Sequence, residues 1–341
     1  MKTSDFDYLL PEELIAQTPI EPRDHSRLMV LSHDTGKIEH RRFYDLPDYL
    51  AAGDVMVFNN SRVFPARLYA KRTDTAAQVE LLLLDCRSTG EWRALVKPGR
   101  RMRPGATFEV AGDDEPGISG EVVEIEPDGS RIVRLSGEER LHELGVVPLP
   151  PYIHEPLADA ERYQTVYSRV AGSVAAPTAG LHFTEALLDR IRKHGVETVF
   201  VTLHVGWDSF RPVDTEDPSA HDLHTESWEM SAEAALAINR AKDEGRRVIS
   251  VGTTAVRLLE HAAMLGDGLL REGSGRADLL ILPGHRFRVI DALVTNFHLP
   301  RSTLLMLTSA FAGREQVLNA YQEAASRRYR FYSFGDAMLV L

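Results

Sequence analysis

The residues of this sequence best suited to chemistry are histidines in turn contexts. His182 follows a turn made by Pro177 and Gly180, and His204 ends a run of β-branched residues. Neutral histidines exchange protons near neutral pH, so the pair favours acid/base catalysis, although a purely structural role for each histidine stays open. Five histidines lie in such contexts: His182, His204, His221, His224 and His298.

A metal site is the main chemical alternative. His221 and His224 are three positions apart, and Glu226 lies close by in the segment HDLHTE. No HExxH motif and no cysteine pair accompany them, so we expect no metal. A GxSxG nucleophile motif is also missing from the sequence, which disfavours a covalent serine mechanism.

A second candidate site follows a predicted strand at residues 246–251. Gly252, Thr253 and Thr254 form a turn there, and a helix that carries Arg257 follows it. The first backbone N–H groups of such a helix are free to bind a carboxylate or a phosphate. The pattern lacks the Gly-Lys-Thr end of a P-loop and is not GxGxxG.

Two basic segments stand out in a chain whose net charge is −11. The first, KPGRRMRPG, contains Lys97, Arg100 and Arg101, and it is either a phosphate contact or a solvated hairpin. The second, RRYRFYSFGDAMLVL, interleaves arginines such as Arg328 and Arg330 with aromatic residues. Arginine with aromatics can clamp phosphates and stack bases, but an edge strand with one buried face has the same pattern.

The elements that must position these residues alternate between helices and strands. Thr184 is a predicted N-cap, Gly195 ends that helix, and residues 196–203 form a strand. In an α/β unit, a turn before a helix and the end of a strand can meet at one sheet edge, where ligands bind. We predict further helices at 11–17, 231–244, 257–264, 302–312 and 316–326, and further strands at 55–58, 278–282 and 293–296.

The residue pattern changes between about residues 71 and 147. Short predicted strands recur there between turn residues, as in a small β-barrel. We therefore predict a larger α/β (α+β) domain, residues 1–68 and 152–341, interrupted by an all-β barrel domain, residues 69–151. The acidic charge excludes non-specific nucleic-acid coating. The N-terminus lacks a signal-peptide core, and the most apolar stretch, residues 302–312, is too short to span a bilayer, so we expect a cytoplasmic protein.

Long strings of this sequence resemble one enzyme family, the S-adenosylmethionine:tRNA ribosyltransferase-isomerases of queuosine biosynthesis. The resemblance runs nearly end to end and includes, in the family's order, VFNNSRVFPARL, WRALVKPGRR, AAPTAGLHFT, TLHVG, HDLHTE, VGTTAVRLLE, TNFHLP and YRFYSFGDAM. The family fold is a larger α/β domain interrupted by a small β-barrel, in agreement with the predicted domains.

The resemblance implies a tRNA substrate that carries 7-aminomethyl-7-deazaguanine at the wobble position. S-adenosylmethionine is then the cosubstrate and ribosyl donor, no prosthetic group is expected, and the products are epoxyqueuosine-tRNA, adenine and methionine. We expect a monomer that binds no membrane. Two alternatives are a tRNA-binding homologue without activity and a metal-dependent hydrolase.

The resemblance also suggests roles for particular residues. Acid/base roles go to His182 and His204, with Asp208 or Glu226 orienting one of them. Arginine and lysine side chains contact tRNA, namely Lys97, Arg100, Arg101, Arg328 and Arg330. Cosubstrate-binding residues are Thr178, Gly180, His224, Gly252, Thr253, Thr254, Arg257 and His298. One departure bears on the site: the family usually has Gly-x-Gly-Thr-Phe after the second histidine, and here Trp207, Asp208 and Ser209 stand between Gly206 and Phe210.

Overall fold

The computed structural model describes residues 1–112, 117–207, 213–221 and 225–341. The chain forms two compact units. The first comprises Met1–Arg62, Pro151–Val170 and Ala176–Leu341, and the second comprises Val63–Pro150 and Ala171–Ala175. The α/β class with an all-β barrel is confirmed, while the boundaries at residues 68 and 151 stay a prediction.

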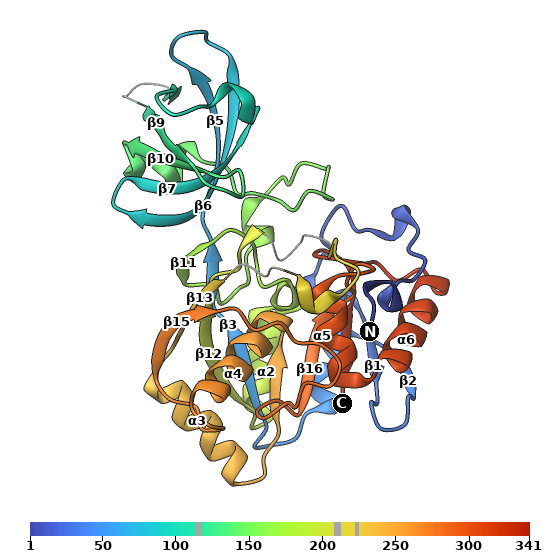
Figure 1. The fold of residues 1–341 in the computed structure, drawn as a ribbon. Coiled ribbons are helices and arrows are strands. Elements are labelled where there is room, and N and C mark those ends of the chain that lie inside the picture. The colour runs from blue at the N-terminus through green and yellow to red at the C-terminus, as the bar shows by residue number, and fades with distance from the viewer. Residues whose placement is uncertain (113–116, 208–212, 222–224) are drawn as a thin grey trace. The chain divides into compact units, whose positions relative to one another are not determined.

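A mixed sheet forms the centre of the first unit, with helices packed against it (Figure 1). Within the described residues it has nine strands, in the order β15-β13-β12-β3-β14-β16-β17-β1-β2. The four strands β12, β3, β14 and β16 run parallel, so their carboxyl ends lie at one edge of the sheet. Their bounds are β1 Arg27–Leu31, β2 Ile38–Arg42, β3 Val55–Asn59, β12 Glu197–Leu203, β13 Glu226–Met230, β14 Val248–Val251, β15 Gly273–Ala277, β16 Ala292–Asn296 and β17 Ala337–Val340.

Serine and threonine caps begin three helices of this unit. The Thr184 hydroxyl accepts a hydrogen bond from Leu187 N at 3.0 Å, which starts α2 as predicted. Ser231 and Ser302 cap α3 and α5 in the same way. The helices are α2 Glu185–Lys193, α3 Ala232–Asp243, α4 Thr253–Leu265, α5 Thr303–Ala312 and α6 Arg314–Ser326.

Buried aromatic rings fix the turn that precedes α2. Phe183 packs edge-on against Phe43, with ring centroids 4.9 Å apart, and against Phe58, with centroids 5.2 Å apart. All three side chains are fully buried. The 3-10 turn Thr178–His182 therefore stands on a rigid aromatic core, which holds His182 in place.

Two local predictions were wrong and one alternative is excluded, because these segments contact residues that are distant in the sequence. Residues 11–17 contain only the short 3-10 turn Glu12–Leu14, since the backbone around Ile15 pairs with Phe331. Residues 278–282 are not a strand, and the Leu279 carbonyl instead accepts a hydrogen bond from Arg257. The C-terminal β17 is not an edge strand, because it lies between β16 and β1.

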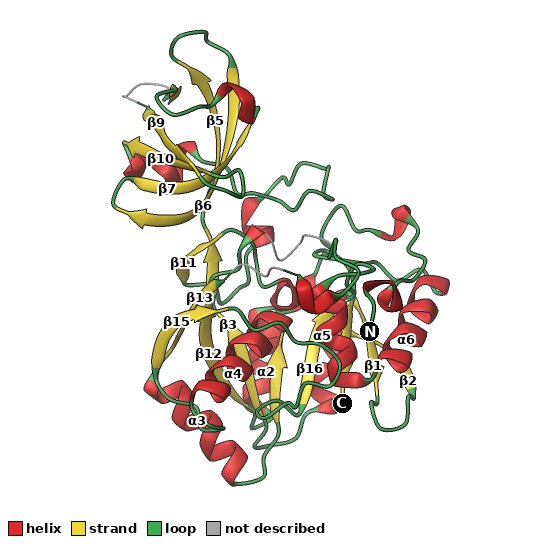
Figure 2. Cartoon of the chain, in the orientation of Figure 1, coloured by secondary structure: helices red, strands yellow, loops and turns green. Residues whose placement is uncertain are grey.

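The second unit is a closed antiparallel barrel in the order β10-β7-β6-β5-β8-β9 (Figure 2). Alternate residues such as Leu81, Leu83 and Phe108 fill its interior, as expected from the short alternating strands. Its strands are β5 Arg67–Arg72, β6 Gln78–Ser88, β7 Glu91–Lys97, β8 Thr107–Val110, β9 Ile118–Ile125 and β10 Arg131–Ser136, with one short helix, α1 Leu141–Leu144. A separate two-stranded sheet pairs β4 Ser61–Val63 with β11 Val170–Ser173.

None of the helices in the described part of the chain is both long enough and apolar enough to cross a membrane.

Candidate functional site

The carboxyl ends of the parallel strands surround a small cavity in the α/β unit. Gly252 follows β14 and Asn296 ends β16, and these two strands are neighbours. The cavity measures about 40 Å³, room for a few water molecules or a carboxylate group. Its walls are formed by Ala176, Pro177, Thr178, Ala179, Val205, Gly252, Thr253, Thr254, Arg257, Thr295, Asn296, His298 and Leu304.

The start of α4 forms one wall of this cavity. Gly252 has a φ of 91°, a conformation that favours glycine, and it turns the chain from β14 directly into the helix. The first N–H groups of a helix have no partner within the helix and carry partial positive charge. Arg257, which is only 6% exposed, adds a guanidinium one turn further on. This wall therefore suits a carboxylate or a phosphate.

The Arg257 side chain is held in place by two partners and keeps one donor unused. Its Nη1 forms a short ion pair with Glu226, and its Nε donates to the Leu279 carbonyl at 3.1 Å. The other Glu226 oxygen accepts a hydrogen bond from Gly206 N at 2.9 Å. Within the described residues, the buried Nη2 of Arg257 has no hydrogen-bond partner. A buried donor without a partner is costly, so an anion in the cavity would satisfy it.

His182 lies behind the cavity wall, and both of its ring nitrogens are engaged. Its Nδ1 lies 2.8 Å from the Ser26 hydroxyl, and its Nε2 accepts a hydrogen bond from Asn296 Nδ2 at 3.1 Å. The Asn296 carbonyl oxygen accepts a hydrogen bond from the Thr178 hydroxyl at 2.9 Å. Burial, aided by nearby Arg330 and Arg23, lowers the pKa of His182 to about 3. His182 is thus a neutral ring that orients two cavity-lining side chains.

His298 reaches the cavity itself. Its Nε2 lies 2.7 Å from the Thr295 hydroxyl, and burial lowers its pKa to about 3. Tyr8 fixes the backbone here, because its hydroxyl donates to the His298 carbonyl at 2.5 Å. The ring is therefore neutral and rigidly placed against whatever binds in the cavity.

His204 differs from the other two histidines in its surroundings. It follows β12, is half-buried, and its backbone N donates to the Ser227 carbonyl at 2.9 Å. Burial lowers the pKa of His204, and the nearby Glu229 carboxylate opposes that shift. Its Nδ1 has no hydrogen-bond partner in the part of the chain that the structure describes. Val205 rather than His204 contributes to the cavity wall, so His204 stands beside the cavity.

The structure gathers several of the predicted residues and separates others. Six line the cavity: Thr178, Gly252, Thr253, Thr254, Arg257 and His298. Glu226 and His182 contact cavity-lining side chains from behind. Gly180 lies in the supporting turn, where an added Cβ would come within 2.0 Å of the Tyr167 hydroxyl oxygen, so this glycine permits close packing. Asp208 and His224 lie outside the described residues.

Sequence analysis assigned no role to Asn296, which links His182 to Thr178. The signal was available, because a polar residue that ends a buried strand and precedes Phe-His-Leu-Pro is unusual in a core. Val205, Thr295 and Leu304 were also missed, since apolar and small residues at such ends carry no distinctive pattern.

The residues predicted to contact tRNA fall into two groups. Lys97, Arg100 and Arg101 are exposed on the barrel unit, and none has a carboxylate partner within the described residues. Arg328 is 71% exposed in its side chain and lies 3.7 Å from Glu13. Arg330 is half-buried and donates to the Thr18 carbonyl, so its guanidinium is committed to the fold.

Base stacking by the C-terminal aromatic residues is not compatible with their burial. Tyr329, Phe331 and Phe334 are at most 3% exposed, and Tyr332 is 7% exposed. These rings pack in the core, because the segment leads into the interior strand β17. In the described part of the chain, no three histidine, cysteine, aspartate or glutamate side chains group as metal ligands do.

The fold and the cavity together define a class of α/β protein with an all-β barrel unit and a small polar cavity at a parallel sheet edge. Residues 3–340 match the model of the family described as queuosine biosynthesis protein, and the chain belongs to this family.

Relatives of known name match this chain over its full length. The chain is 54% identical to the S-adenosylmethionine:tRNA ribosyltransferase-isomerases of Dehalococcoides mccartyi (strain CBDB1) and Desulfitobacterium hafniense, covering all of each protein. It also matches the crystal structure of S-adenosylmethionine tRNA ribosyltransferase from Thermotoga maritima at 40% identity and a TM-score of 0.58, over 99% of this chain and 100% of that one.

Proposed function

We propose that this protein transfers the ribosyl group of S-adenosylmethionine to 7-aminomethyl-7-deazaguanine at the wobble position of tRNA and isomerises it, giving epoxyqueuosine. The full-length match to the family carries this proposal, together with relatives of the same name that are 54% identical. Adenine and methionine are released. The same matches do not favour an inactive tRNA binder or a metal-dependent hydrolase. We further propose a monomer that acts in the cytoplasm.

The anion site supports binding of the methionine carboxylate. The α4 N-terminus and Arg257, whose buried Nη2 has no hydrogen-bond partner among the described residues, line a cavity with room for one carboxylate group. Glu226 balances the Arg257 charge, so the attraction for the carboxylate comes from the N–H groups at the start of α4 and from the Nη2 donor of Arg257. The ribose and adenine would extend outward from the cavity, because its volume of about 40 Å³ cannot hold them.

The chemistry requires three proton-handling steps. The sulfonium acidifies the neighbouring 5′ carbon, so a base must take a proton there. Adenine needs a proton when it leaves, and the attacking amine must be neutral. Histidines that stay uncharged at neutral pH suit these steps.

We assign the proton-accepting role to His204, because its lowered pKa keeps the ring neutral and none of the described residues engages its Nδ1. His182 and His298 have hydrogen-bonded partners, which supports positioning roles for both. An orienting role for Asp208 and a cosubstrate contact for His224 stay predictions.

One reaction tests the proposed function. Purified protein is mixed with S-adenosylmethionine and tRNA that carries 7-aminomethyl-7-deazaguanine, and adenine release and the nucleoside mass are measured. Adenine together with the mass of epoxyqueuosine is the expected result. The matched control is the same tRNA with guanine at the wobble position, which has no attacking amine and should release no adenine. Adenine release without a change in the nucleoside mass would contradict the transfer step.

A further inference from the structure

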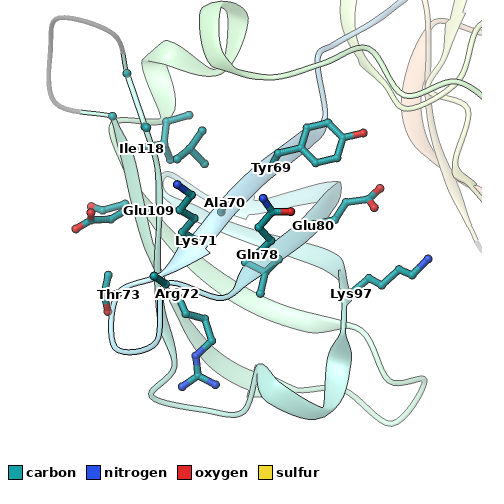
Figure 3. Close-up of a pocket in the computed structure, with 17 residues that line it drawn as sticks. Tyr69, Ala70, Lys71, Arg72, Thr73, Gln78, Glu80, Lys97, Glu109 and Ile118 are labelled. Atoms are coloured by element: carbon teal, nitrogen blue, oxygen red, sulfur yellow. The ribbon is translucent and has the colours of Figure 1, made fainter. Parts of the chain in front are cut away.

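The barrel unit contains a second, larger pocket that the proposed chemistry does not use. It measures about 1100 Å³, comparable with the roughly 300–1,000 Å³ of small-ligand pockets. It lies on the outer face of the barrel, over β5 and the start of β6, and it extends to Lys97 at the end of β7 and Glu109 on β8 (Figure 3). All of its lining residues belong to the barrel unit.

Strand register brings the polar side chains of this pocket onto one continuous face. Tyr69 on β5 is paired with Glu80 on β6, and Glu80 is paired with Lys97 on β7. In the next row, Lys71 is paired with Gln78 and with Glu109. Adjacent residues such as Ala70 and Val79 are buried in the barrel, so the side chains between them project outward.

Tyr69 gives this face an aromatic platform. Tyr69 is 59% exposed, whereas its neighbours on β5, Leu68 and Ala70, are buried in the barrel. Figure 3 shows its ring standing at the rim above Gln78, with Lys71 beside the amide. Exposed aromatic rings on the strands of small barrels are the usual surfaces on which nucleic-acid bases stack. The Gln78 amide can donate and accept hydrogen bonds along a base edge.

Two lysines of this pocket are available to bind phosphate groups. Lys71 and Lys97 have no carboxylate partner in the part of the chain that the structure describes. Of the acidic lining residues, Glu80 is paired with Arg67 at 3.1 Å, and Glu109 is left as the opposing charge. Phosphate groups therefore meet two available ammonium groups on this face.

The basic loop after β7 extends this charge. It contains exposed Arg100, Arg101 and Arg103, which also have no carboxylate partner among the described residues. The pocket residue Arg72 donates to the Arg101 carbonyl at 2.6 Å, so this loop is tied to the wall of the pocket. The basic loop is therefore attached to the pocket through Arg72, in a chain whose net charge is −11.

We propose that this pocket binds an unpaired nucleotide of the tRNA substrate, with its base stacked on Tyr69 and the adjacent phosphates held by Lys71 and Lys97. The inference rests on the proposed function, since the RNA is the tRNA of that reaction. An unpaired nucleotide is required, because a base inside a helix cannot present its face to an aromatic ring.

The test is the dissociation constant of the full-length protein for the tRNA, measured without S-adenosylmethionine. Tyr69→Ala removes the ring and is expected to weaken binding roughly 5- to 150-fold, the effect of losing one stacked base. Tyr69→Phe keeps the ring and should bind within about twofold of wild type. Ile125→Ala is the matched control, because Ile125 is an exposed apolar residue of the same barrel, 41% exposed and outside the pocket.

Turnover adds a second readout. Tyr69→Ala should raise the KM for tRNA and leave the KM for S-adenosylmethionine as in wild type. Lys71→Gln and Lys97→Gln should each reduce the slope of log affinity against log salt by about 1. Thermal unfolding of every variant checks that the barrel is folded.

Normal tRNA affinity in folded Tyr69→Ala would overturn the proposal, and so would an equal loss in Tyr69→Ala and Tyr69→Phe. If Tyr69→Ala lost more affinity for a short acidic peptide than for tRNA, that result would also contradict a nucleotide site. A different result would contradict the proposed function. If wild-type protein bound tRNA through Tyr69 but released no adenine, the nucleotide pocket would be supported and the proposed reaction would be contradicted.

Discussion

The cavity at the sheet edge and the pocket on the barrel differ in how firmly their polar side chains are held. In the cavity, Arg257 is 6% exposed and is held by Glu226 and a backbone carbonyl, so one donor is aimed in a fixed direction. On the barrel, Tyr69 is 59% exposed, and the lysines beside it have no carboxylate partner among the described residues. Fixed groups suit a small cosubstrate whose atoms must react, whereas free side chains suit a long polyanion.

The difference predicts where substitutions cost stability and where they cost only binding. Substitutions at the cavity should affect both stability and catalysis, because hydrogen bonds and an ion pair link its residues and the side chains behind them. Changes on the barrel face should leave the fold intact.

The largest effect is expected at the buried ion pair. Arg257→Ala leaves Glu226 buried without its partner, so the free energy of unfolding should fall by about 3–5 kcal/mol. The KM for S-adenosylmethionine should also rise, since the anion site loses its guanidinium. Urea unfolding and steady-state kinetics measure the two effects.

Arg247→Ala is the matched control for that variant. Arg247 pairs with the buried Asp54 and does not line the cavity. It should lose stability while the KM for S-adenosylmethionine stays unchanged. Equal KM values in the two variants would show that Arg257 acts only through the fold.

His204→Ala should lower kcat by about 10²–10⁴-fold, the contribution of a general base. Its thermal stability should stay close to that of wild type, because the half-buried ring makes no side-chain hydrogen bond within the described residues. Single-turnover adenine release measures the loss. His142→Ala, an exposed histidine of the barrel, serves as the control, and a similar small loss in both variants would remove His204 from the chemistry.

The buried histidines predict a dependence of stability on pH. The pKa of an unfolded histidine is about 6.5, and those of folded His182 and His298 are lowered to about 3. Between these values the unfolded chain binds the protons, so stability is complete above about pH 6.5 and decreases as the pH falls toward 3. Each histidine contributes about 1.4 kcal/mol per pH unit to this decrease.

Urea unfolding between pH 7 and pH 4 measures that slope. His298→Gln should make it shallower by one histidine's share, while Tyr69→Ala should leave it unaltered. An identical slope in wild type and His298→Gln would contradict the neutral, buried state of this ring.

The smallest effect is expected on the barrel. Arg100→Gln should weaken tRNA binding a few-fold and reduce the slope of log affinity against log salt by about 1, with no change in stability. Arg330→Gln is the contrasting variant: the Arg330 guanidinium donates to the Thr18 carbonyl, so its loss should lower stability instead. A salt slope that stays the same in Arg100→Gln would exclude a phosphate contact there.

Local signals in the sequence predicted most of the helices and strands and part of the candidate site. Thr184 caps its helix as predicted, and Ser231 and Ser302 cap the helices predicted over 231–244 and 302–312, since capping depends on residues three positions apart. The Gly252–Thr254 turn and Arg257 line the cavity as one contiguous motif. The inserted barrel was visible in its short strands.

The sequence by itself therefore determined the α/β and barrel architecture, the helix caps and the candidate anion turn, because these follow from neighbouring residues and from side-chain periodicity. Only the tertiary structure decided that Glu226 pairs with Arg257 and that Ser26 and Asn296 engage His182, partners that lie 31, 156 and 114 positions apart in the chain. Burial and hydrogen bonding between such distant residues set which histidine is held neutral and which donor stays unpaired. Both depend on the folded surroundings of a side chain.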